Sequence, residues 1–189
     1  MDPLPRSFYT RRTDNVARDL LGKLLVRRLD DELLGGVIVE TEAYFGGDDP
    51  ASRAFEGLKT YNRLMFEAPG YVFIYNVHKY WMLNLIAHTD GVGGILIRAI
   101  EPTMRTETMK QNRPVKRLRD LTNGPGKLTL ALDVDNRLNG VDATSIDSPV
   151  YVLDNEYKCN VKTSYRIGVT RDLPEHYRYY VENNRFVSN

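Results

Sequence analysis

The sequence predicts an α+β fold, a curved antiparallel β-sheet with surrounding helices and a protruding β-hairpin, in a single domain over residues 1–189. Three observations lead to this prediction. Most apolar segments have the period of two that is typical of strands, and only a few short segments have a helical pattern. The chain has 189 residues, enough for one hydrophobic core and short for two. No internal repeat, low-complexity tract or linker-like stretch divides it.

The N-terminal part predicts one helix and two strands. Either Thr13 or Asp14 is placed to cap a short helix with one apolar face, which Gly22 ends. Leu24–Leu29 alternates like a strand, and the acidic piece DDELLGG then turns the chain. A long strand follows over residues 36–44.

The remainder reads mainly as strands. A polar loop runs to about residue 62, and YVFIYNVHKYWMLNLIA then forms two β-rich runs bent around residues 76–79, a hairpin with a polar tip. GGILIRAIEP is a strand that ends at Pro102, and a partly helical basic segment follows it. NGPGKLTLAL opens a helix at residues 124–127, and residues 154–188 are expected to form closing strands.

Composition excludes several classes of protein and site. No apolar run approaches the ~20 residues of a membrane span, and the first residues lack the apolar centre of a signal peptide, so we expect an intracellular protein. The single cysteine, Cys159, excludes an internal disulfide and a cysteine-based zinc site, and the three histidines are scattered. We therefore expect neither a metal nor a cofactor.

The net charge of +1 hides a basic segment. Between Pro102 and Lys127, seven basic and two acidic residues give a local charge of +5, which leaves −4 for the rest of the chain. Such a segment either lies along a phosphate backbone or is the solvated surface of a helix and loop. The charge pattern alone leaves both interpretations open.

The stretch ETEAYFGGDDPASRAF places two carboxylates about 7 Å apart on one face of a strand. Glu40 and Glu42 share that face with Tyr44, and burial of two like charges would raise the pKa of at least one. The pair either includes a general base or faces water, and the neighbouring Tyr44 favours a pocket for a flat heterocycle. Arg98, charged amid the apolar residues of ILIRAIEP, is expected to have a buried carboxylate partner.

Two further motifs concern binding. NGPGK, which ends in Lys127, either cradles an anion with backbone N–H groups or forms a simple turn and helix cap. The aromatic hairpin suits a hydrophobic core, whereas its polar tip, His78 and Lys79, suits a probe that enters a groove.

The order of the motifs along the chain is more specific than any one of them. They are ETEAY with the DDPAS turn, MFEAPG, the hairpin ending in MLN, LIRAIEP, NGPGKL and RIGV. In this order and spacing the chain resembles the 3-methyladenine (alkyladenine) DNA glycosylase family, in its mammalian-type fold. The resemblance covers practically the whole chain, from LLGKLLVRRL near Leu20 to RYYVENNRFVS at the C-terminus.

The resemblance implies a DNA repair enzyme that starts base excision repair. Such enzymes flip a damaged purine out of double-stranded DNA and hydrolyse its N-glycosidic bond with water. The purines are alkylated or deaminated, for example 3-methyladenine, 7-methylguanine, hypoxanthine and ethenoadenine. No lysine nucleophile is implied, so a monofunctional enzyme without a cofactor is expected, acting as a monomer.

The resemblance also assigns residues to the chemistry. Glu42 matches the family's general base, whose carboxylate deprotonates the attacking water and stabilises positive charge on the sugar. Arg98 and the backbone carbonyl of Ile167 match positions that help to hold that water. Arg98 would also keep Glu42 ionised.

A pocket for the flipped base follows from the same comparison. Tyr44 and Tyr75 match the aromatic walls between which the base stacks, and cationic alkylated purines gain extra attraction there. Asn84 matches the residue whose bulk and polarity disfavour the exocyclic amino group of normal guanine. Lys127 matches the basic end of the NGPGK motif, which we expect to contact DNA.

Two positions depart from the family pattern. ASRAF places Arg53 where members usually carry a histidine that donates a hydrogen bond to the flipped base. Arginine is always protonated and only donates, so Arg53 either favours acceptor-rich bases such as hypoxanthine over cationic methylpurines or turns towards phosphate. At the hairpin tip, His78 and Lys79 replace the usual tyrosine and glycine. We expect His78 to be the wedge and Lys79 to contact phosphate, with Val77 as the alternative wedge.

Two other functions remain open at this stage. A lesion-binding protein that kept the fold and lost catalysis is favoured by Arg53 and His78 and disfavoured by the presence of Glu42 and Arg98. A hydrolase of free nucleosides would keep the pocket beside Glu42 but needs neither a basic segment nor a projecting hairpin. Activity on duplex DNA compared with free nucleosides distinguishes the hydrolase from the glycosylase.

Overall fold

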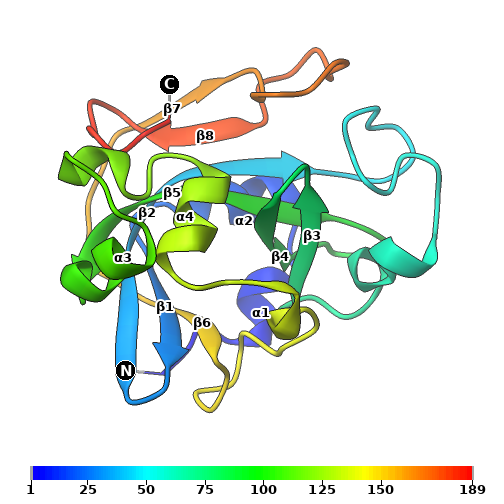
Figure 1. The fold of residues 1–189 in the computed structure, drawn as a ribbon. Coiled ribbons are helices and arrows are strands. Elements are labelled where there is room, and N and C mark those ends of the chain that lie inside the picture. Colours follow the sequence, from blue (N-terminus) through cyan, green and yellow to red (C-terminus); the bar gives the residue numbers. More distant parts are fainter. Residues whose placement is uncertain (1, 189) are drawn as a thin grey trace.

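An antiparallel sheet dominates the computed structural model, which describes residues 2–188 (Figure 1). Within these residues eight strands are paired, in the order β3-β4-β5-β2-β1-β6, while β8 pairs with β2 and with β7. Strand β2 is therefore the centre of the sheet, with β5 along one edge and β1 and β8 sharing the other. The strands are β1 (Leu24–Leu29), β2 (Glu32–Tyr44), β3 (Val72–Val77), β4 (Tyr80–Ile86), β5 (Gly94–Met104), β6 (Val150–Leu153), β7 (Val161–Ser164) and β8 (Arg178–Val181).

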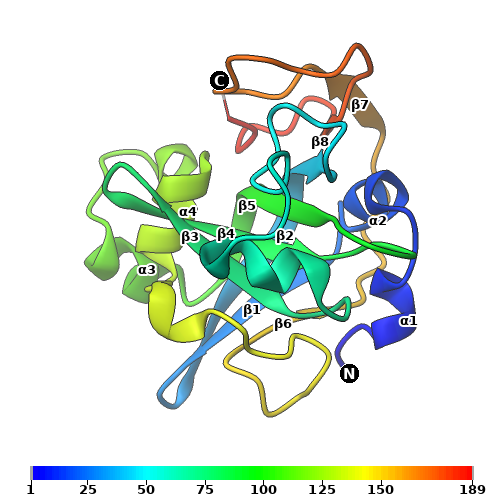
Figure 2. The same ribbon diagram turned by 90° about the vertical axis from the view of Figure 1, so that its right-hand side faces the viewer.

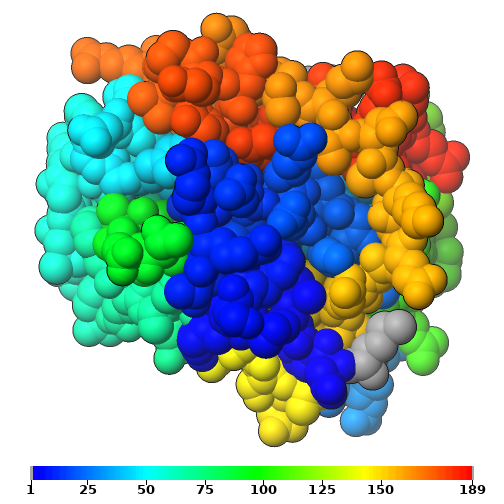
Figure 3. Space-filling view, turned by 180° about the vertical axis from the view of Figure 1, so that it is seen from behind, coloured from blue at the N-terminus to red at the C-terminus, as the bar shows by residue number. Residues whose placement is uncertain are grey.

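Short helices cover both faces of the sheet. Helix α2 contacts β2, β5 and β8, whereas α4 contacts β4 and β5. Figure 2 shows α1 and α2 on one side of the sheet and α3 and α4 on the other. Figure 3 shows the N-terminal helices, in blue, across the back of the molecule below the orange part of the chain around β7 and the loop that follows it. The helices are α1 (Arg6–Tyr9), α2 (Thr13–Asp19), α3 (Thr106–Asn112) and α4 (Pro125–Ala131), with 3₁₀ turns η1 (Thr60–Phe66), η2 (Leu118–Asp120) and η3 (Asn136–Leu138).

Strand β2 is buried along most of its length, because residues 34–43 are covered on both faces. Its pairing with β5 is irregular at Gly36 and on both sides of Glu40. Such bulges bend a strand and increase its twist, which curves the sheet. A Cβ atom on Gly36 would overlap the carbonyl oxygen of Glu101, so glycine permits the close approach of β5 at this point.

The predicted α+β fold, with its curved sheet and protruding hairpin, is confirmed. Strands β3 and β4 pair up to Val77 and Tyr80, which leaves His78 and Lys79 as a two-residue turn. His78 has a φ of 54°. The turns preferred in two-residue hairpins need a positive φ at their first position, and histidine adopts this conformation more readily than most residues.

Strand β2 begins earlier than the sequence predicted. The turn before it contains only Asp30 and Asp31, and β2 starts at Glu32 rather than at residue 36. Asp30 has a φ of 51°, a conformation that aspartate tolerates better than bulky residues do. The piece DDELLGG is therefore mostly strand, because a two-residue turn suffices to reverse the chain.

Strand β5 ends later than predicted, at Met104 rather than at Pro102. Pro102 pairs with Gly36 beside an irregularity in the ladder. On the other edge of β5, β4 pairs only with residues 94–96. The missing N–H of Pro102 is tolerated because proline is compatible with a bulge or an unpaired strand edge.

The predicted N-terminal helix exists with different ends. Thr13 lies inside α2 instead of capping it, and its hydroxyl donates to the carbonyl of Ala87 (2.9 Å). The helix ends at Asp19, before Gly22. The N-cap position is Arg12, whose side chain makes no capping bond, while Asp14 in the first turn accepts from the N–H group of Asn15 (3.0 Å).

The closing part of the chain is less regular than predicted. Between residues 154 and 188 only β7 and β8 are strands, and a loop over residues 165–177 joins them. The sequence did not predict α1, η1 or β6. Helix α1 and strand β6 have four residues each, too few to display a clear period, and η1 is a 3₁₀ turn without the period of an α-helix. No helix within residues 2–188 combines the length and the apolar character needed to cross a membrane.

Candidate active site

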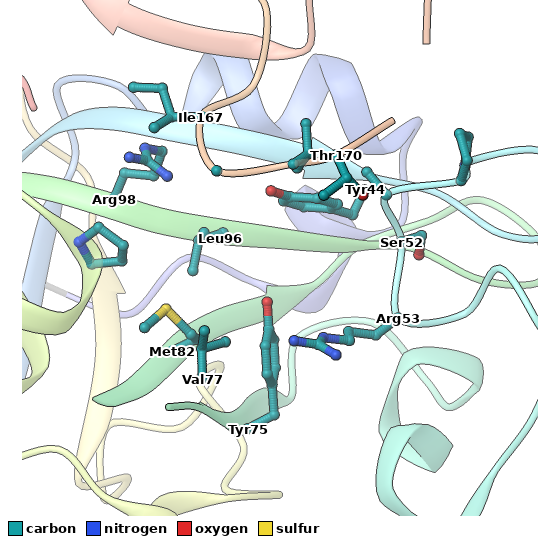
Figure 4. A pocket seen from close by; sticks show the side chains of 15 residues that line it. Tyr44, Ser52, Arg53, Tyr75, Val77, Met82, Leu96, Arg98, Ile167 and Thr170 are labelled. Carbon is teal, nitrogen blue, oxygen red and sulfur yellow. The ribbon is translucent and has the colours of Figure 1, made fainter. Parts of the chain in front are cut away.

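A cavity of about 500 Å³ opens beside the C-terminal end of β2 (Figure 4). Its walls come from the loop after β2, the β3–β4 hairpin, β5, the start of α4 and the loop between β7 and β8. These segments are far apart in the sequence, so the tertiary structure creates the cavity. Residues that line it include Tyr44, Arg53, Tyr75, Val77, Arg98 and Ile167.

Glu42 lies directly behind this lining and has no exposed surface. Its Oε2 accepts hydrogen bonds from the Tyr44 hydroxyl (2.7 Å) and from Nη1 of Arg98 (3.2 Å). Its Oε1 accepts from the N–H group of Ile167 (2.7 Å). All three donors belong to residues that line the cavity. The Glu42 carboxylate is thus held at the cavity wall by groups from β2, β5 and the β7–β8 loop.

The pKa of Glu42 is raised above its ordinary value of 4.5, because burial disfavours the charged carboxylate. Arg98, the Ile167 N–H group and the Tyr44 hydroxyl oppose this rise, and the charge of Glu40 adds to it. Arg98 therefore favours the ionised form, as expected, but burial outweighs it. A raised pKa suits a general base, which works best when its pKa is near the operating pH.

Glu40, the other carboxylate on this face, is fully buried and bonded to other parts of the protein. Its Oε1 accepts from Nε of Arg98 (2.9 Å) and from Nε of Arg178 (2.7 Å). Ser188 donates its hydroxyl to Oε1 and its N–H to Oε2, at 2.7 Å each. Three of these four bonds fall on Oε1 and one on Oε2, and two of the donors are arginines. Of the three donor residues only Arg98 lines the cavity, whereas all three donors to Glu42 do. Glu42 is consequently the candidate base of the pair.

Arg98 connects the two glutamates and is 5% exposed. The prediction that Arg98 has a buried carboxylate partner is confirmed, since it pairs with both Glu40 and Glu42. In the pairing of β5 with β2, Arg98 is the residue skipped between Ala99 and Ile97. Bulges of this kind re-aim side chains and occur next to active sites, which explains how a mid-strand arginine reaches both carboxylates.

Two tyrosine rings stand on different sides of the cavity, Tyr44 from β2 and Tyr75 from β3 (Figure 4). Each ring has a guanidinium group stacked on it. Cζ of Arg166 lies 4.6 Å from the centroid of Tyr44, and Cζ of Arg53 lies 4.7 Å from that of Tyr75. Burial raises the pKa of both tyrosines, so their hydroxyl groups stay protonated near neutral pH. The rings are thus neutral platforms with restricted motion.

Arg166, which the sequence did not single out, holds the Tyr44 side of the cavity. Its side chain is fully buried and binds both carboxylate oxygens of Asp49 at 2.7 Å. It also donates to Asp172 (2.6 Å) and to the carbonyl of Ala43 (2.8 Å). This arginine ties the DDPAS turn and the β7–β8 loop to the back of Tyr44. Arg166 and Asp49 are 117 residues apart, so no local pattern could have paired them.

Arg53 and Asn84 have different positions at the predicted base site. Arg53 is exposed and lines the cavity, with no carboxylate at ion-pairing distance in the part of the chain that the structure describes. Asn84 is buried and borders a void of about 10 Å³ beside Tyr75, rather than the main cavity. Its amide nitrogen donates to the carbonyls of Phe73 and Met82, at 3.1 Å each. The role predicted for Asn84 at the base stays a prediction.

The predicted DNA-contacting residues are only partly brought to the cavity. His78 and Lys79 are exposed at the hairpin tip, whereas Val77, the alternative wedge, lines the cavity. Lys127 donates to Oδ1 of Asn123 (2.9 Å) at the start of the seven-residue helix α4. For Ile167, the recorded contact with Glu42 uses its N–H group. The roles predicted for the Ile167 carbonyl and for Lys127 stay predictions.

Much of the basic segment is occupied with local contacts. Arg105 pairs with Glu32, while Arg117 and Arg119 both pair with Asp120. These are exposed pairs, which contribute little to stability and leave the surface available. Among residues 2–188, no three histidine, cysteine or acidic side chains converge in a way that could hold a metal ion.

Comparisons with known proteins point to one family. The family model described as methylpurine-DNA glycosylase (MPG) matches residues 7–185. A protein of Mesorhizobium japonicum is 41% identical over 98% of this chain and 90% of its own length. A Bacillus subtilis protein is 38% identical (99% and 97%), and one from the archaeon Aeropyrum pernix 37% identical (98% and 92%). All three are named as 3-methyladenine DNA glycosylases, a provisional assignment in each case.

Proposed function

The chain belongs to the methylpurine-DNA glycosylase family, and on that premise we propose that it removes damaged purines from double-stranded DNA with a water molecule activated by Glu42. As a DNA glycosylase it is a hydrolase that acts on DNA in base excision repair. One observation carries the proposed mechanism: Glu42 is a fully buried carboxylate of raised pKa, held by three donors at the wall of an aromatic cavity.

The cavity supports binding of a flipped purine. Its volume of about 500 Å³ is within the range of small-molecule sites and accommodates a purine with its sugar. The base stacks between Tyr44 and Tyr75, whose neutral rings accept any planar heterocycle. Asn84 borders the small void that Tyr44 and Tyr75 also line, so its bulk limits how far an exocyclic group of the base enters that void.

The contacts of Glu42 indicate which oxygen receives the proton. Oε2 already accepts from two donors, Tyr44 and Arg98, whereas Oε1 accepts only from the Ile167 N–H group. Oε1 therefore keeps an acceptor position for the water. The proton of the water passes to Oε1, its oxygen bonds to the anomeric carbon, and the electron pair of the broken C–N bond leaves with the purine. The carboxylate also stabilises the positive charge that develops on the sugar.

Among damaged purines we expect neutral, acceptor-rich bases such as hypoxanthine to react faster than cationic methylpurines. The Arg53 guanidinium stacks on Tyr75 at the cavity, and no carboxylate within residues 2–188 neutralises it at ion-pairing distance. Its fixed positive charge repels a cationic base and donates hydrogen bonds to acceptor atoms. Replacement of Arg53 by histidine should reduce the difference in the rate of base release between neutral and cationic lesions.

Single-turnover base release tests the proposal. Duplexes that carry hypoxanthine, 1,N6-ethenoadenine or methylated purines are incubated with the wild-type protein and with Glu42→Gln, and free nucleosides serve as alternative substrates. Glu107→Gln, a change at a glutamate whose side chain is 81% exposed, is the matched control. Release from duplex DNA that persists in Glu107→Gln and disappears with Glu42 supports the glycosylase mechanism.

Other outcomes point to other functions. Tight lesion binding without base release would favour a non-catalytic damage binder. Release from free nucleosides at the same rate as from duplex DNA would favour a nucleoside hydrolase. An active Glu42→Gln protein would exclude Glu42 as the general base, since loss of a general base costs about 10²- to 10⁴-fold.

A further inference from the structure

Ser188, near the C-terminal end of the chain, contacts the buried charges behind the cavity with every polar atom that it has. Its N–H and hydroxyl groups donate to Glu40, at 2.7 Å each. Its hydroxyl oxygen accepts from Nη2 of Arg98 (3.2 Å), and its carbonyl accepts from Nη2 of Arg178 (3.1 Å). A serine on the surface of a tail would not need four such contacts. Ser188 therefore forms part of the interior of the site.

The contacts of Arg98 explain what Ser188 contributes. Nε of Arg98 is bound to Glu40, Nη2 to the Ser188 hydroxyl, and Nη1 to Glu42. Two of the three nitrogen atoms are thus fixed from behind, by Glu40 and Ser188. The planar guanidinium has a rigid shape, so fixing these two atoms determines where Nη1 points. Nη1 is the nitrogen that contacts the candidate base.

We propose that Ser188 is a positioning residue of the active site, which holds the Arg98 guanidinium so that Nη1 stays on Glu42. This inference rests on the proposed function, in which Glu42 activates the water. It extends the site to a residue 146 positions from Glu42 that does not line the cavity. The C-terminal segment, residues 184–188, then has a part in catalysis as well as in folding.

The C-terminal segment is itself anchored, as a positioning element has to be. Phe186 is 1% exposed and packs into the main hydrophobic core. Asn184 donates to Glu101 (2.8 Å) and accepts from the N–H group of Phe186 (2.9 Å). These contacts fix the chain two residues before Ser188. Ser188 itself is 9% exposed, and its hydroxyl bonds to Glu40 and Arg98.

Loss of the Ser188 hydroxyl leaves Nη2 of Arg98 without its acceptor in a buried place. An unpaired buried donor is costly, so we expect the guanidinium to turn until Nη2, as well as Nε, donates to the Glu40 carboxylate. That rotation takes Nη1 away from Glu42. Misplacement of a catalytic group by about 1 Å costs on the order of 10²-fold in rate. The loss should appear in the chemical step and not in binding.

The test compares Ser188→Ala with Ser148→Ala in the full chain. Ser148 is a buried serine whose hydroxyl bonds only to the backbone of Val150, so its replacement removes one buried hydroxyl away from the cavity. We expect Ser188→Ala to lower the single-turnover rate by about 10- to 100-fold with unchanged affinity for the lesion duplex, while Ser148→Ala keeps the wild-type rate. Ser188→Thr, which restores a hydroxyl, should recover much of the lost rate.

The pH dependence supplies a readout that a folding defect would not move. Arg98 opposes the rise in the pKa of Glu42, as do Tyr44 and the Ile167 N–H group, whereas Glu40 adds to it. Displacement of Arg98 in Ser188→Ala should therefore move the acid limb of the rate profile to higher pH. An acid limb at the wild-type pH would overturn the proposal, as would a rate equal to that of Ser148→Ala.

A crystal structure of Ser188→Ala separates this inference from the proposed function. If the wild-type protein releases no base from any duplex, the proposed function fails, and the crystal structure still reports whether Arg98 leaves Glu42. An Nη1–Oε2 distance unchanged from 3.2 Å in that variant would show that Ser188 does not position Arg98.

Discussion

Two groups of polar residues, one buried behind the cavity and one on the surface, have opposite surroundings. The carboxylate cluster, which we define as Glu40, Glu42 and Arg98, is buried, and each of its charged groups has partners at 2.7–3.2 Å. The rim, defined as Arg53, His78 and Lys79, is exposed and has no carboxylate partner in the described part of the chain. The charges of the cluster are paired inside the protein, whereas those of Arg53 and Lys79 in the rim are exposed to a ligand. A DNA backbone is the ligand that such a rim suits.

The carboxylate cluster contains a second contrast, between its two glutamates. Glu40 accepts from two arginines and from Ser188, so its charge is compensated. Glu42 accepts from one arginine and two neutral groups, and its pKa is raised by burial. A compensated carboxylate stabilises a fold, whereas an incompletely compensated one is available for proton transfer.

The largest expected effect concerns Glu42. Glu42→Gln should lower the rate of base release by about 10²- to 10⁴-fold, because a neutral amide cannot accept the proton of the water. The same variant should be at least as stable as the wild type at pH 7. Folding raises the pKa of Glu42, so the stability that its neutral form gives is complete below pH 4.5 and is lost as the pH rises through the folded-state pKa.

Thermal unfolding at pH 4 and pH 7 checks this statement. At pH 4 the melting temperatures of Glu42→Gln and the wild type should be similar. At pH 7 the variant should have the higher melting temperature. A variant that melts lower at pH 7 would mean that the Glu42 charge stabilises the fold, and the contrast with Glu40 would disappear.

Glu40→Ala should have the largest effect on stability. It leaves the buried Arg98 and the half-buried Arg178 without their shared carboxylate, and breaking a buried ion pair costs about 3–5 kcal/mol in the free energy of unfolding. Urea unfolding measures this loss. The control is Glu107→Ala, a change at an exposed glutamate, whose free energy of unfolding should stay within about 0.5 kcal/mol of the wild type. A loss as small as that of the control would show that Glu40 is not the structural member of the pair.

A rim substitution should change DNA binding alone. For Lys79→Ala we expect weaker binding to all duplexes, and a salt dependence of the affinity that falls by about one unit in its log–log slope, because one phosphate contact is lost. Its stability should stay within about 0.5 kcal/mol of the wild type, since Lys79 is exposed. An unchanged slope in titrations at several salt concentrations would remove Lys79 from the DNA interface.

The smallest expected effect is a change of pH profile in Tyr44→Phe. The Tyr44 hydroxyl donates to Glu42 and thereby opposes the rise in the pKa of that carboxylate. The variant keeps the aromatic ring for stacking and loses only this hydrogen bond. The acid limb of the single-turnover rate should therefore move to higher pH, and base release measured across a pH series detects the change. A shift to lower pH would contradict the assigned hydrogen bond.

The sequence predicted those parts of the fold and site that depend on local pattern. Alternation placed Glu40, Glu42 and Tyr44 on one face. In agreement, Arg98 donates to both glutamates and the Tyr44 hydroxyl donates to Glu42. The polar residues at the hairpin tip were located because strand-like runs flank them. The ends of elements were predicted less accurately. Strand β5 was expected to end at Pro102 and continues to Met104, because whether a strand tolerates a proline depends on which strands lie beside it.

The family resemblance already pointed to Glu42, but only the tertiary structure shows how the surroundings of the two glutamates differ. Glu40 and Glu42 look equivalent in sequence, and they differ because Ser188 and Arg178 arrive from the far end of the chain at one and Ile167 at the other. Local pattern determines which face a side chain shares, since period and turn chemistry act over a few residues. Burial and partners come from contacts between distant segments, and these set the charge state on which the chemistry depends.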